Sequence, residues 1–600
     1  MLVWAALPNP ALGADAGEGE AAESSEGLSF RLEVISKDRD VARLLRRNLD
    51  IQRFANFQDL QPGELRRLLA EAEANARDLL AAQGYFNPGL ELRTDDVLPN
   101  PGEPRRIEIE VDPGEPTRVA RHSVEFSEPM NSAAEGEEQR KTIRLGWPLR
   151  QGERFTQEAW DAAKTGGLRT LRRERYPTAR VADSQATINA DDATAEVSVT
   201  YDPGPAYRFG ELQLPDLQRY DARGIRNIAR IPTGQVYSEV KLLDAQQRLV
   251  ASGYLDSAFL MLDPDEDDPE HATVQAQITE AKYQKMVFGV GFSNDEGFGF
   301  SVDHTHNKMW PLGWRAVNRI ALATKTQLLA SRWTAMPGDS GWAWHLGGEL
   351  ERSDYGDYKA DSISLNAGRS KSFDRTDRSY YLQYDASLAE GSGGPPNSSS
   401  ILANFALTRR YFDDRLNPTS GYGFGGEAGV GHTLTPDADP FLRLNVRGIL
   451  FWPFGEPFAG RRRSRIVLRS ELGAIYAGSD VDIPVTLLFL TGGGLSVRGY
   501  GFQSIGAQLP DGSVYGARYL GTGSVEWQQP ITLLGNSESW EYALFADGGT
   551  AFDKASDATL YTGVGTGLRW NSPVGAMQAD VAYGIESKDV RLHLRFGFQF

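Results

Sequence analysis

Residues 492–501 read GGGLSVRGYG, and this stretch predicts how the second half of the chain folds. An apolar run, Val485 to Leu490, leads into a glycine cluster whose backbone can take conformations closed to other residues. A single arginine, Arg498, lies inside this turn. Arg498 is either a solvated surface residue or a cation held by buried acids. The pattern of the flanking chain favours the second interpretation.

From about residue 284 the chain alternates apolar and polar residues between turns, as strands with two different faces do. The C-terminus shows this most plainly, because its apolar residues share one parity: Val590, Leu592, Leu594, Phe596, Phe598 and Phe600. About sixteen such segments follow one another at roughly 20 residues each, which is the pace of an outer-membrane barrel with strands of ~10 residues. Lipid offers no partner to a bare sheet edge, so the sheet must close. We expect a 16-stranded transmembrane β-barrel over residues 283–600, with an inward-folded loop at 477–516.

The same parity places two acids inside the barrel. Trp540 and Leu544 share the outward parity, so Phe545 and Asp547 point into the lumen. In the preceding strand the outward parity belongs to Val525 and Trp527, and Glu526 therefore points inward. An inward loop can bring the Arg498 guanidinium to either carboxylate. Such a charge-assisted pair orients well but adds little net stability, so we expect it to hold one loop conformation.

Residues from about 28 to 281 repeat one pattern three times. Glycines that precede a helix recur at Gly63, Gly152 and Gly234, which are 89 and then 82 residues apart. The spacing predicts three β-α-α-β-β domains, at residues 28–114, 115–204 and 205–282. Each small sheet has an edge that can accept a strand from a partner, although the domains can also be simple spacers. Arg175 stands where the first copy has Gly84, which predicts a weaker helix end.

Composition excludes several other functions. A net charge of -18 argues against a nucleic-acid-binding surface over the whole chain. The chain has no cysteine, and its seven histidines form no zinc-binding pattern. We find no catalytic acid, base and nucleophile at credible spacing, and expect no enzyme activity, cofactor or metal. Residues 1–27 resemble the tail of a secretory signal followed by a disordered linker.

Several of these residues resemble motifs of the BamA/TamA superfamily of outer-membrane assembly proteins. Val497, Arg498, Gly499 and Tyr500 resemble its inward-loop motif, and residues 545–549 resemble the strand motif that receives the arginine. Further likenesses are the acid Glu526, the segment 414–422 with Glu427 beyond it, and the POTRA-domain opening at 203–207. The resemblance covers about residues 28 to 600, and it implies α+β POTRA domains followed by a membrane all-β barrel.

Three repeats resemble the TamA type, the outer-membrane subunit of the translocation and assembly module. This implies a bacterial outer-membrane protein with its POTRA domains in the periplasm. The expected partners are an inner-membrane-anchored, periplasm-spanning TamB-like protein, nascent β-barrel clients such as autotransporters, and the lipid bilayer.

The resemblance also implies that clients enter the membrane through a weak seam between the first and last barrel strands. The first strand is glycine-rich, which weakens it. The expected seam residues are Val287, Gly289, Val290, Gly291, Phe596, Phe598 and Phe600. The sequence leaves open phospholipid transport between membranes, a two-partner-secretion transporter and a passive pore.

Overall fold

A computed structural model describes residues 30–57, 62–94, 104–128, 130, 136–355, 358–373, 375–391, 395–414, 418–458, 462–508, 512–572 and 575–599. The expected signal remnant and linker at 1–27 lie outside these residues. The chain separates into two compact units. One holds residues 1–210, 233–239 and 264–272, and the other holds residues 211–232, 240–263 and 273–600. Among the helices described, none combines the length and the apolar character needed to traverse a lipid bilayer.

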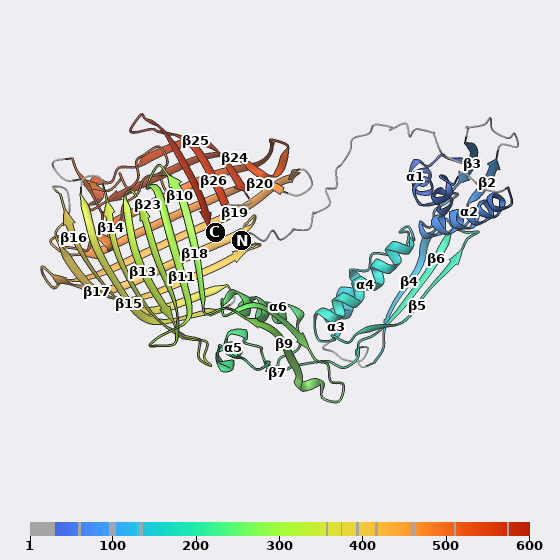
Figure 1. The fold of residues 1–600 in the computed structure, drawn as a ribbon, viewed down its shortest axis with the longest axis horizontal. Helices are drawn as coiled ribbons and strands as arrows, with labels where there is room; N and C mark the ends of the chain where they lie inside the picture. Colours follow the sequence, from blue (N-terminus) through green and yellow to red (C-terminus); the bar gives the residue numbers. More distant parts are fainter. Residues whose placement is uncertain are drawn as a thin grey trace, which may run out of the picture. The chain divides into compact units, whose positions relative to one another are not determined.

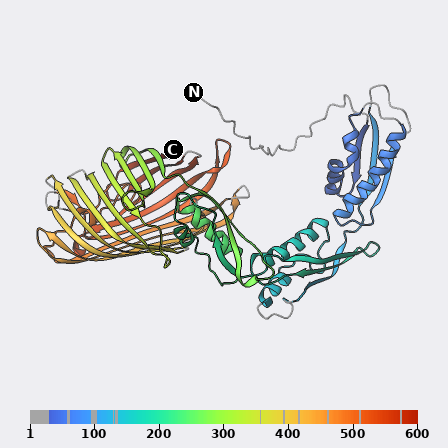
Figure 2. The ribbon, with the colours of Figure 1, turned by 60° about the horizontal axis from the view of Figure 1, so that its bottom comes forward.

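The first repeat is a three-stranded sheet with helices packed against one face (Figure 2). Its strands pair in the order β1-β3-β2, with β1 parallel to β3. Asp38 begins the first helix by accepting hydrogen bonds from the backbone N–H groups of Asp40 and Val41. The elements are β1 (Phe30–Ser36), α1 (Arg39–Asn48), the short 3-10 helix η1 (Asp50–Phe54), α2 (Pro62–Ala82), β2 (Gly89–Thr94) and β3 (Arg105–Asp112).

The second and third repeats follow the same order of elements. Their sheets pair as β4-β6-β5 and β7-β9-β8, so the last strand of each repeat lies in the middle, as in the first. The predicted β-α-α-β-β pattern is therefore present three times. The elements are β4 (Arg118–Phe126), α3 (Glu137–Leu145), α4 (Gln157–Arg173), β5 (Arg180–Asn189), β6 (Thr194–Asp202), β7 (Phe209–Gln213), α5 (Ala222–Ala229), α6 (Glu239–Ala251), β8 (Leu255–Leu262) and β9 (Ala272–Glu280).

The turn after the second helix of each repeat has the same backbone geometry, although one repeat lacks the glycine. Gly84 and Gly253 have φ angles of 87° and 73°, and Arg175 has a φ of 72°. The arginine takes the left-handed conformation that glycine adopts more readily. Its backbone N–H donates to the Tyr237 carbonyl and its carbonyl accepts from the Tyr207 N–H. The turn is thus held by backbone hydrogen bonds that do not depend on the side chain.

Sixteen antiparallel strands form a closed barrel, as predicted. They run side by side in chain order around the wall, and β27 pairs with β10 to close it (Figure 1). The strands are β10 (Gln284–Ser293), β11 (Gly297–Met309), β12 (Trp314–Ala323), β13 (Thr326–Thr334), β14 (Ala343–Asp354), β15 (Lys359–Phe373), β16 (Thr376–Glu390), β17 (Ser398–Phe412), β18 (Gly421–Thr435), β19 (Pro440–Phe458), β20 (Arg462–Ala477), β23 (Tyr519–Leu533), β24 (Asn536–Phe552), β25 (Tyr561–Ser572), β26 (Gly575–Gly584) and β27 (Val590–Gln599).

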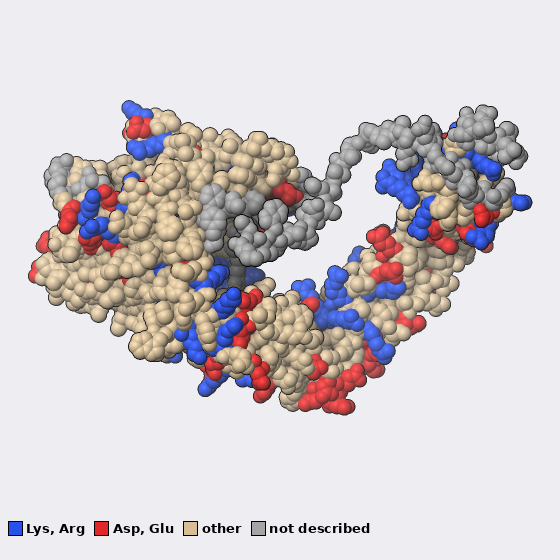
Figure 3. Space-filling model, viewed as in Figure 1, with Lys and Arg blue, Asp and Glu red and all other residues tan. Residues whose placement is uncertain are grey.

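The two faces of the barrel wall differ as the alternation predicts. On β23 the outward Val525 is 53% exposed while Glu526 is buried, and on β24 Leu544 is exposed while Phe545 and Asp547 are buried. In the view of Figure 3 the outer wall carries few charged side chains, which gather towards the strand ends. An apolar outer band with polar groups inside is what a lipid-facing barrel requires.

Candidate functional site

The connection between β20 and β23 folds into the barrel, where its apolar residues pack against the wall. It contains a 3-10 turn, η4 (Val485–Leu487), and a small hairpin of β21 (Ala507–Gln508) and β22 (Val514–Tyr515). One buried cluster joins loop residues with wall residues: Leu402, Phe441, Ile475, Val481, Ile483, Leu487, Phe489, Val497, Tyr500, Ile505, Ala507, Ala517, Leu520 and Ala551. The apolar run before the glycines therefore seats the loop by hydrophobic burial.

Arg498 lies at the tip of this loop, completely buried, and contacts both predicted acids. Its Nε and Nη2 donate to the two Asp547 carboxylate oxygens at 2.6 and 2.8 Å, a bidentate pair. Its Nη1 donates to Glu526 Oε2 at 2.7 Å. Its backbone N–H also donates to Asp547 Oδ2, at 3.1 Å. The predicted loop–barrel contact is confirmed, and it fixes both the side chain and the backbone of Arg498.

A third carboxylate, which the sequence analysis missed, belongs to the same network. Asp580 on β26 is fully buried and accepts from Arg498 Nη1 at 3.2 Å. Arg569 on β25 donates to both Glu526 oxygens at 3.1 Å and pairs with Asp580. Arg469 on β20 stands 3.6 Å from Glu526. Three arginines thus face three carboxylates, and this balance of charge makes their burial tolerable.

The loop tip fits because glycines on the wall leave room for its backbone. A Cβ added at Gly563 would lie 1.8 Å from the Arg498 carbonyl oxygen, and one at Gly549 would lie 2.5 Å from Val497 Cγ2. The guanidinium carbon of Arg498 lies 3.3 Å from the centre of the Phe545 ring. Phe545 and Gly549 of the strand motif therefore have steric roles beside the acid: one stacks on the arginine and the other admits the loop.

Tyr500 holds the loop on the other side of Gly499. Its hydroxyl donates to the Thr562 carbonyl at 3.1 Å and accepts from the Glu586 backbone N–H at 3.2 Å. Its ring packs edge-on against Tyr561. Gly499 has a φ of 94° and lies against the backbone of Gly584. A Cβ added at Gly499 would lie 2.7 Å from the backbone nitrogen of Gly584. Each residue of the predicted loop motif therefore contacts the last strands of the barrel.

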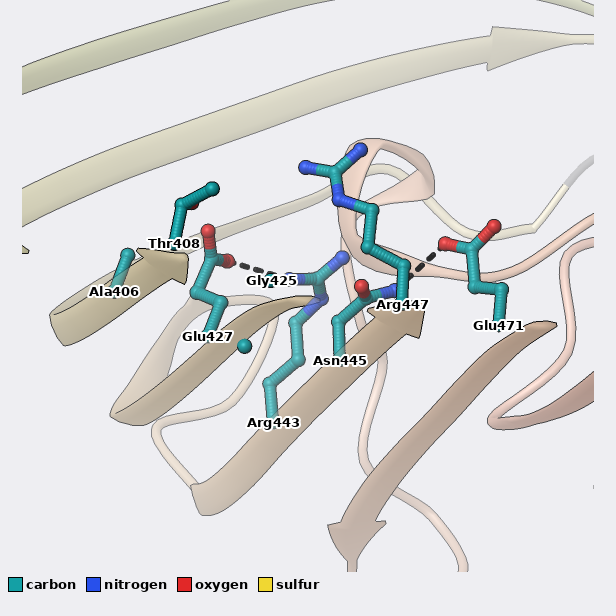
Figure 4. A pocket seen from close by; sticks show the side chains of 9 residues that line it. Ala406, Thr408, Gly425, Glu427, Arg443, Asn445, Arg447 and Glu471 are labelled. Atoms are coloured by element: carbon teal, nitrogen blue, oxygen red, sulfur yellow. Dashed lines mark hydrogen bonds and ion pairs between the residues drawn. The ribbon is translucent and has the colours of Figure 1, made fainter. Parts of the chain in front are cut away.

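A second group of wall residues holds the base of the loop. Arg443 on β19 donates from Nε to the Leu487 carbonyl at 3.1 Å and from Nη1 to Glu427 Oε1 at 2.8 Å. Figure 4 shows Glu427 and Arg443 directed towards each other beside a lumenal cavity of about 230 Å³. Glu427 is the acid that follows the segment 414–422, whose residues 415–417 lie outside the described part of the chain. The sequence indicated Glu427 but not its partner.

The seam between β10 and β27 is short. Among the described residues, five of β10, Gly289–Ser293, pair with residues 595–599 of β27, whereas all ten residues of β10 pair with β11. Residues 284–288 pair with β11 on one side and have no described partner on the β27 side. This leaves backbone N–H and C=O groups of β10 open to another strand.

The predicted seam residues lie on these two strands. Gly289, Val290 and Gly291 pair with β27, and Val287 lies in the part of β10 that has no described partner on the β27 side. Phe596 packs against Phe292 across the seam, with ring centres 6.5 Å apart. Phe598 is placed by its backbone register opposite Val290, and Phe600 lies outside the described residues. Whether these residues open as a seam stays a prediction.

Comparisons with known proteins agree with this architecture. A model of the Omp85 superfamily domain matches residues 289–600, more than half of the chain. The outer membrane protein assembly factor BamA of Neorickettsia risticii is 23% identical over 420 residues, which cover 65% of this chain and 54% of the relative. BamA of Neisseria meningitidis serogroup B is 21% identical over 478 residues, covering 69% and 59%. The chain therefore spans about half the length of the curated relatives it matches.

The fold is also similar to a solved structure. The crystal structure of BamA from Haemophilus ducreyi lacking POTRA domains 1–3 superimposes with a TM-score of 0.60 and 15% identity, covering 80% of this chain and all of that one. This likeness concerns the fold. The barrel is an outer-membrane β-barrel, and the α/β domains before it are POTRA-like domains of the periplasm. With the family model matching more than half of its residues, the chain belongs to the Omp85 superfamily.

Proposed function

We propose that this protein helps to fold and insert β-barrel proteins into the outer membrane, through the seam between β10 and β27. The observation that carries the proposal is the short ladder at this seam, five residues on β10, beside residues 284–288, which have no described partner on the β27 side. A client strand can pair with that open edge and keep its backbone hydrogen bonds satisfied on entering lipid. This mechanism has no catalytic step and uses no cofactor.

The inward loop supports the proposal because it gives the barrel wall one fixed arrangement next to the seam. Arg498 ties the loop to β23, β24 and β26, which are among the last strands before the seam. A fixed wall on that side keeps β23 to β26 in place while a client strand is added at β10. We therefore assign Arg498, Glu526 and Asp547, with Phe545, Gly499 and Tyr500 around them, the role of positioning the loop during assembly.

At a finer level, we propose the TamA type, which rests on the sequence resemblance in which three repeats precede the barrel. The expected partner is an inner-membrane-anchored, periplasm-spanning protein like TamB, and the expected clients are autotransporter-like barrels. Co-purification with such a partner, and its loss when the repeats are deleted, tests this assignment. A chain that co-purifies with no such periplasm-spanning protein would contradict the finer assignment and leave the coarser one.

The central experiment is depletion of the protein, with two quantities measured in parallel. Surface levels of autotransporters should fall while the lipid composition of the outer leaflet stays unchanged. The reverse result, altered lipid with normal autotransporters, would favour a phospholipid conduit. Export of one soluble polypeptide with both quantities unchanged would favour a two-partner-secretion transporter. In bilayer recordings, a large and constantly open conductance would argue for a passive pore.

A further inference from the structure

The inward loop contacts both sides of the seam, and it does so through backbone N–H groups of its own glycines. The Gly494 N–H donates to Asp295 Oδ2 at 2.7 Å. Asp295 lies in the turn between β10 and β11, on the first side of the seam. The Gly499 N–H donates to His593 Nε2 at 3.0 Å, and His593 belongs to β27, on the other side. A single loop segment therefore bridges the two strands that close the barrel.

The two acceptors also face each other. His593 is buried, and its Nδ1 lies 3.7 Å from Asp295 Oδ1. Because Nε2 accepts a hydrogen bond, a neutral imidazole carries its ring hydrogen on Nδ1, on the side of Asp295. The carboxylate thus receives the loop N–H through one oxygen and faces the imidazole with the other. Asp295 and His593 therefore lie side by side across the seam and are joined through the loop segment that donates to both.

The glycine cluster that opens the loop motif is explained by this contact. A Cβ added at Gly493 would lie 3.0 Å from Asp295 Oδ2, and one at Gly494 would lie 3.1 Å from the same atom. Real Cβ atoms rarely come so close, so a substitution would force the loop and the carboxylate apart by a few tenths of an ångström. The backbone of Arg498 fits because Gly563 on the barrel wall has no side chain, and the contact with Asp295 fits because Gly493 and Gly494 in the loop have none.

The neighbouring turn residue closes the same end of the seam. The Leu594 N–H donates to Asn294 Oδ1 at 3.1 Å, and the Asn294 N–H donates to the Leu594 carbonyl at 3.4 Å. These bonds continue the ladder of Gly289–Ser293 past its last pair. The loop contacts therefore lie at the end of the seam that is paired, opposite to the open residues 284–288.

We propose that Asp295 and His593 are positioning residues through which the inward loop holds the seam closed. This clasp rests on the proposed function, in which the seam opens for a client. While the loop is seated, its backbone links the β10–β11 turn to β27, and the short ladder cannot separate at this end without breaking at least one of the two contacts. When the loop withdraws, both acceptors are released together, and the ladder alone closes the barrel.

Amide hydrogen exchange of the purified full-length protein in lipid nanodiscs tests the clasp without any client. In Asp295→Ala and in His593→Ala, those amides of Gly289–Ser293 that face β27 should exchange about tenfold faster, which corresponds to the loss of one hydrogen bond with a charged or buried acceptor, while those that face β11 should not change. Asp295→Asn keeps an oxygen acceptor for the Gly494 N–H and should remain near the wild-type rate. Exchange in β17 and β18, on another part of the wall, should not change.

Glu296→Ala is the matched control, because Glu296 is the next residue of the same turn and is exposed. It should leave the seam rate unchanged. Gly494→Ala is the second variant, since it displaces the loop while Asp295 and its charge remain. Barrel folding is checked for every variant by its heat-dependent mobility on gels.

Two results would overturn the clasp. One is unchanged exchange at the seam in folded Asp295→Ala, His593→Ala and Gly494→Ala, even if the loop amides exchange faster. The other is an equal increase in Glu296→Ala. The clasp and the proposed function can fail independently of each other. If the seam loosens in the variants but depletion of the protein leaves client levels unchanged, the clasp is supported and the assembly role is contradicted.

Discussion

Replacing Arg498 with alanine should release the inward loop from a barrel that stays folded. The side chain donates to Asp547, Glu526, Asp580 and Ser524, and it is fully buried. Its removal leaves three buried carboxylates facing two arginines. Breaking a buried ion pair from one side costs about 3–5 kcal/mol. The equilibrium for loop docking should therefore shift by a factor of about 10² to 10⁴.

Amide exchange and protease cleavage of residues 494–500 measure this shift directly. The buried apolar cluster still favours the inward position, so the loop should open far more often without leaving the lumen permanently. Arg498→Lys should give an intermediate rate, because an ammonium cannot form the bidentate pair with Asp547. Arg447→Ala is the control, since Arg447 is an exposed arginine on the lumenal side of β19. Equal loop protection in Arg498→Ala and Arg447→Ala would refute the reasoning.

Four further predictions follow from other parts of the structure. A disulfide between cysteines placed at Phe292 and Phe596, which face each other across the seam, should form on oxidation and abolish client assembly, with recovery on reduction; full activity of the crosslinked barrel would contradict seam opening. Gly563→Ala should displace the loop about as strongly as loss of its arginine, because the added Cβ would lie 1.8 Å from a loop carbonyl; wild-type protease protection of the loop would exclude this clash. Arg175→Gly should stabilise the second repeat by about 1 kcal/mol, by relieving a left-handed arginine, and slow its amide exchange in the full chain. The amide N–H of Asp40 holds the pKa of Asp38 below its usual value, so the capping contribution to the stability of α1 should be present above pH about 4 and be lost as the pH falls through the lowered pKa. Asp38→Ala should lower the stability of α1 by about 0.5–2 kcal/mol at neutral pH, and exchange of the α1 amides measured against pH tests both expectations.

The residues that sequence analysis placed correctly are those in strands with a strict alternation. Glu526 and Asp547 each lie between large outward residues, so their parity fixes the direction in which they point. Asp580 lies in a strand whose neighbours Ala579 and Val581 contrast less, yet the exposed Val581 and Tyr583 give the same parity signal. That signal was present in the sequence and would have found the third carboxylate.

Contacts between turns and loops could not be predicted in this way. Parity places His593 inside the barrel, but nothing in the sequence pairs it with a turn acid 298 positions away. The partnership of Arg443 with Glu427 depends on the register of two neighbouring strands, which alternation alone does not set. The repeat pattern marked Arg175 as standing in the place of Gly84, but the backbone bonds that hold its left-handed conformation come from another repeat and could not be predicted.

The order of the arginine and its acids along the chain has a consequence for how this protein itself matures. Arg498 is synthesised before Glu526, Asp547 and Asp580, and these acids come from three different strands of the last quarter of the chain. The loop can therefore reach its final place only after the C-terminal strands have been aligned. Complete docking of Arg498 therefore requires β23, β24 and β26 to be in register with one another.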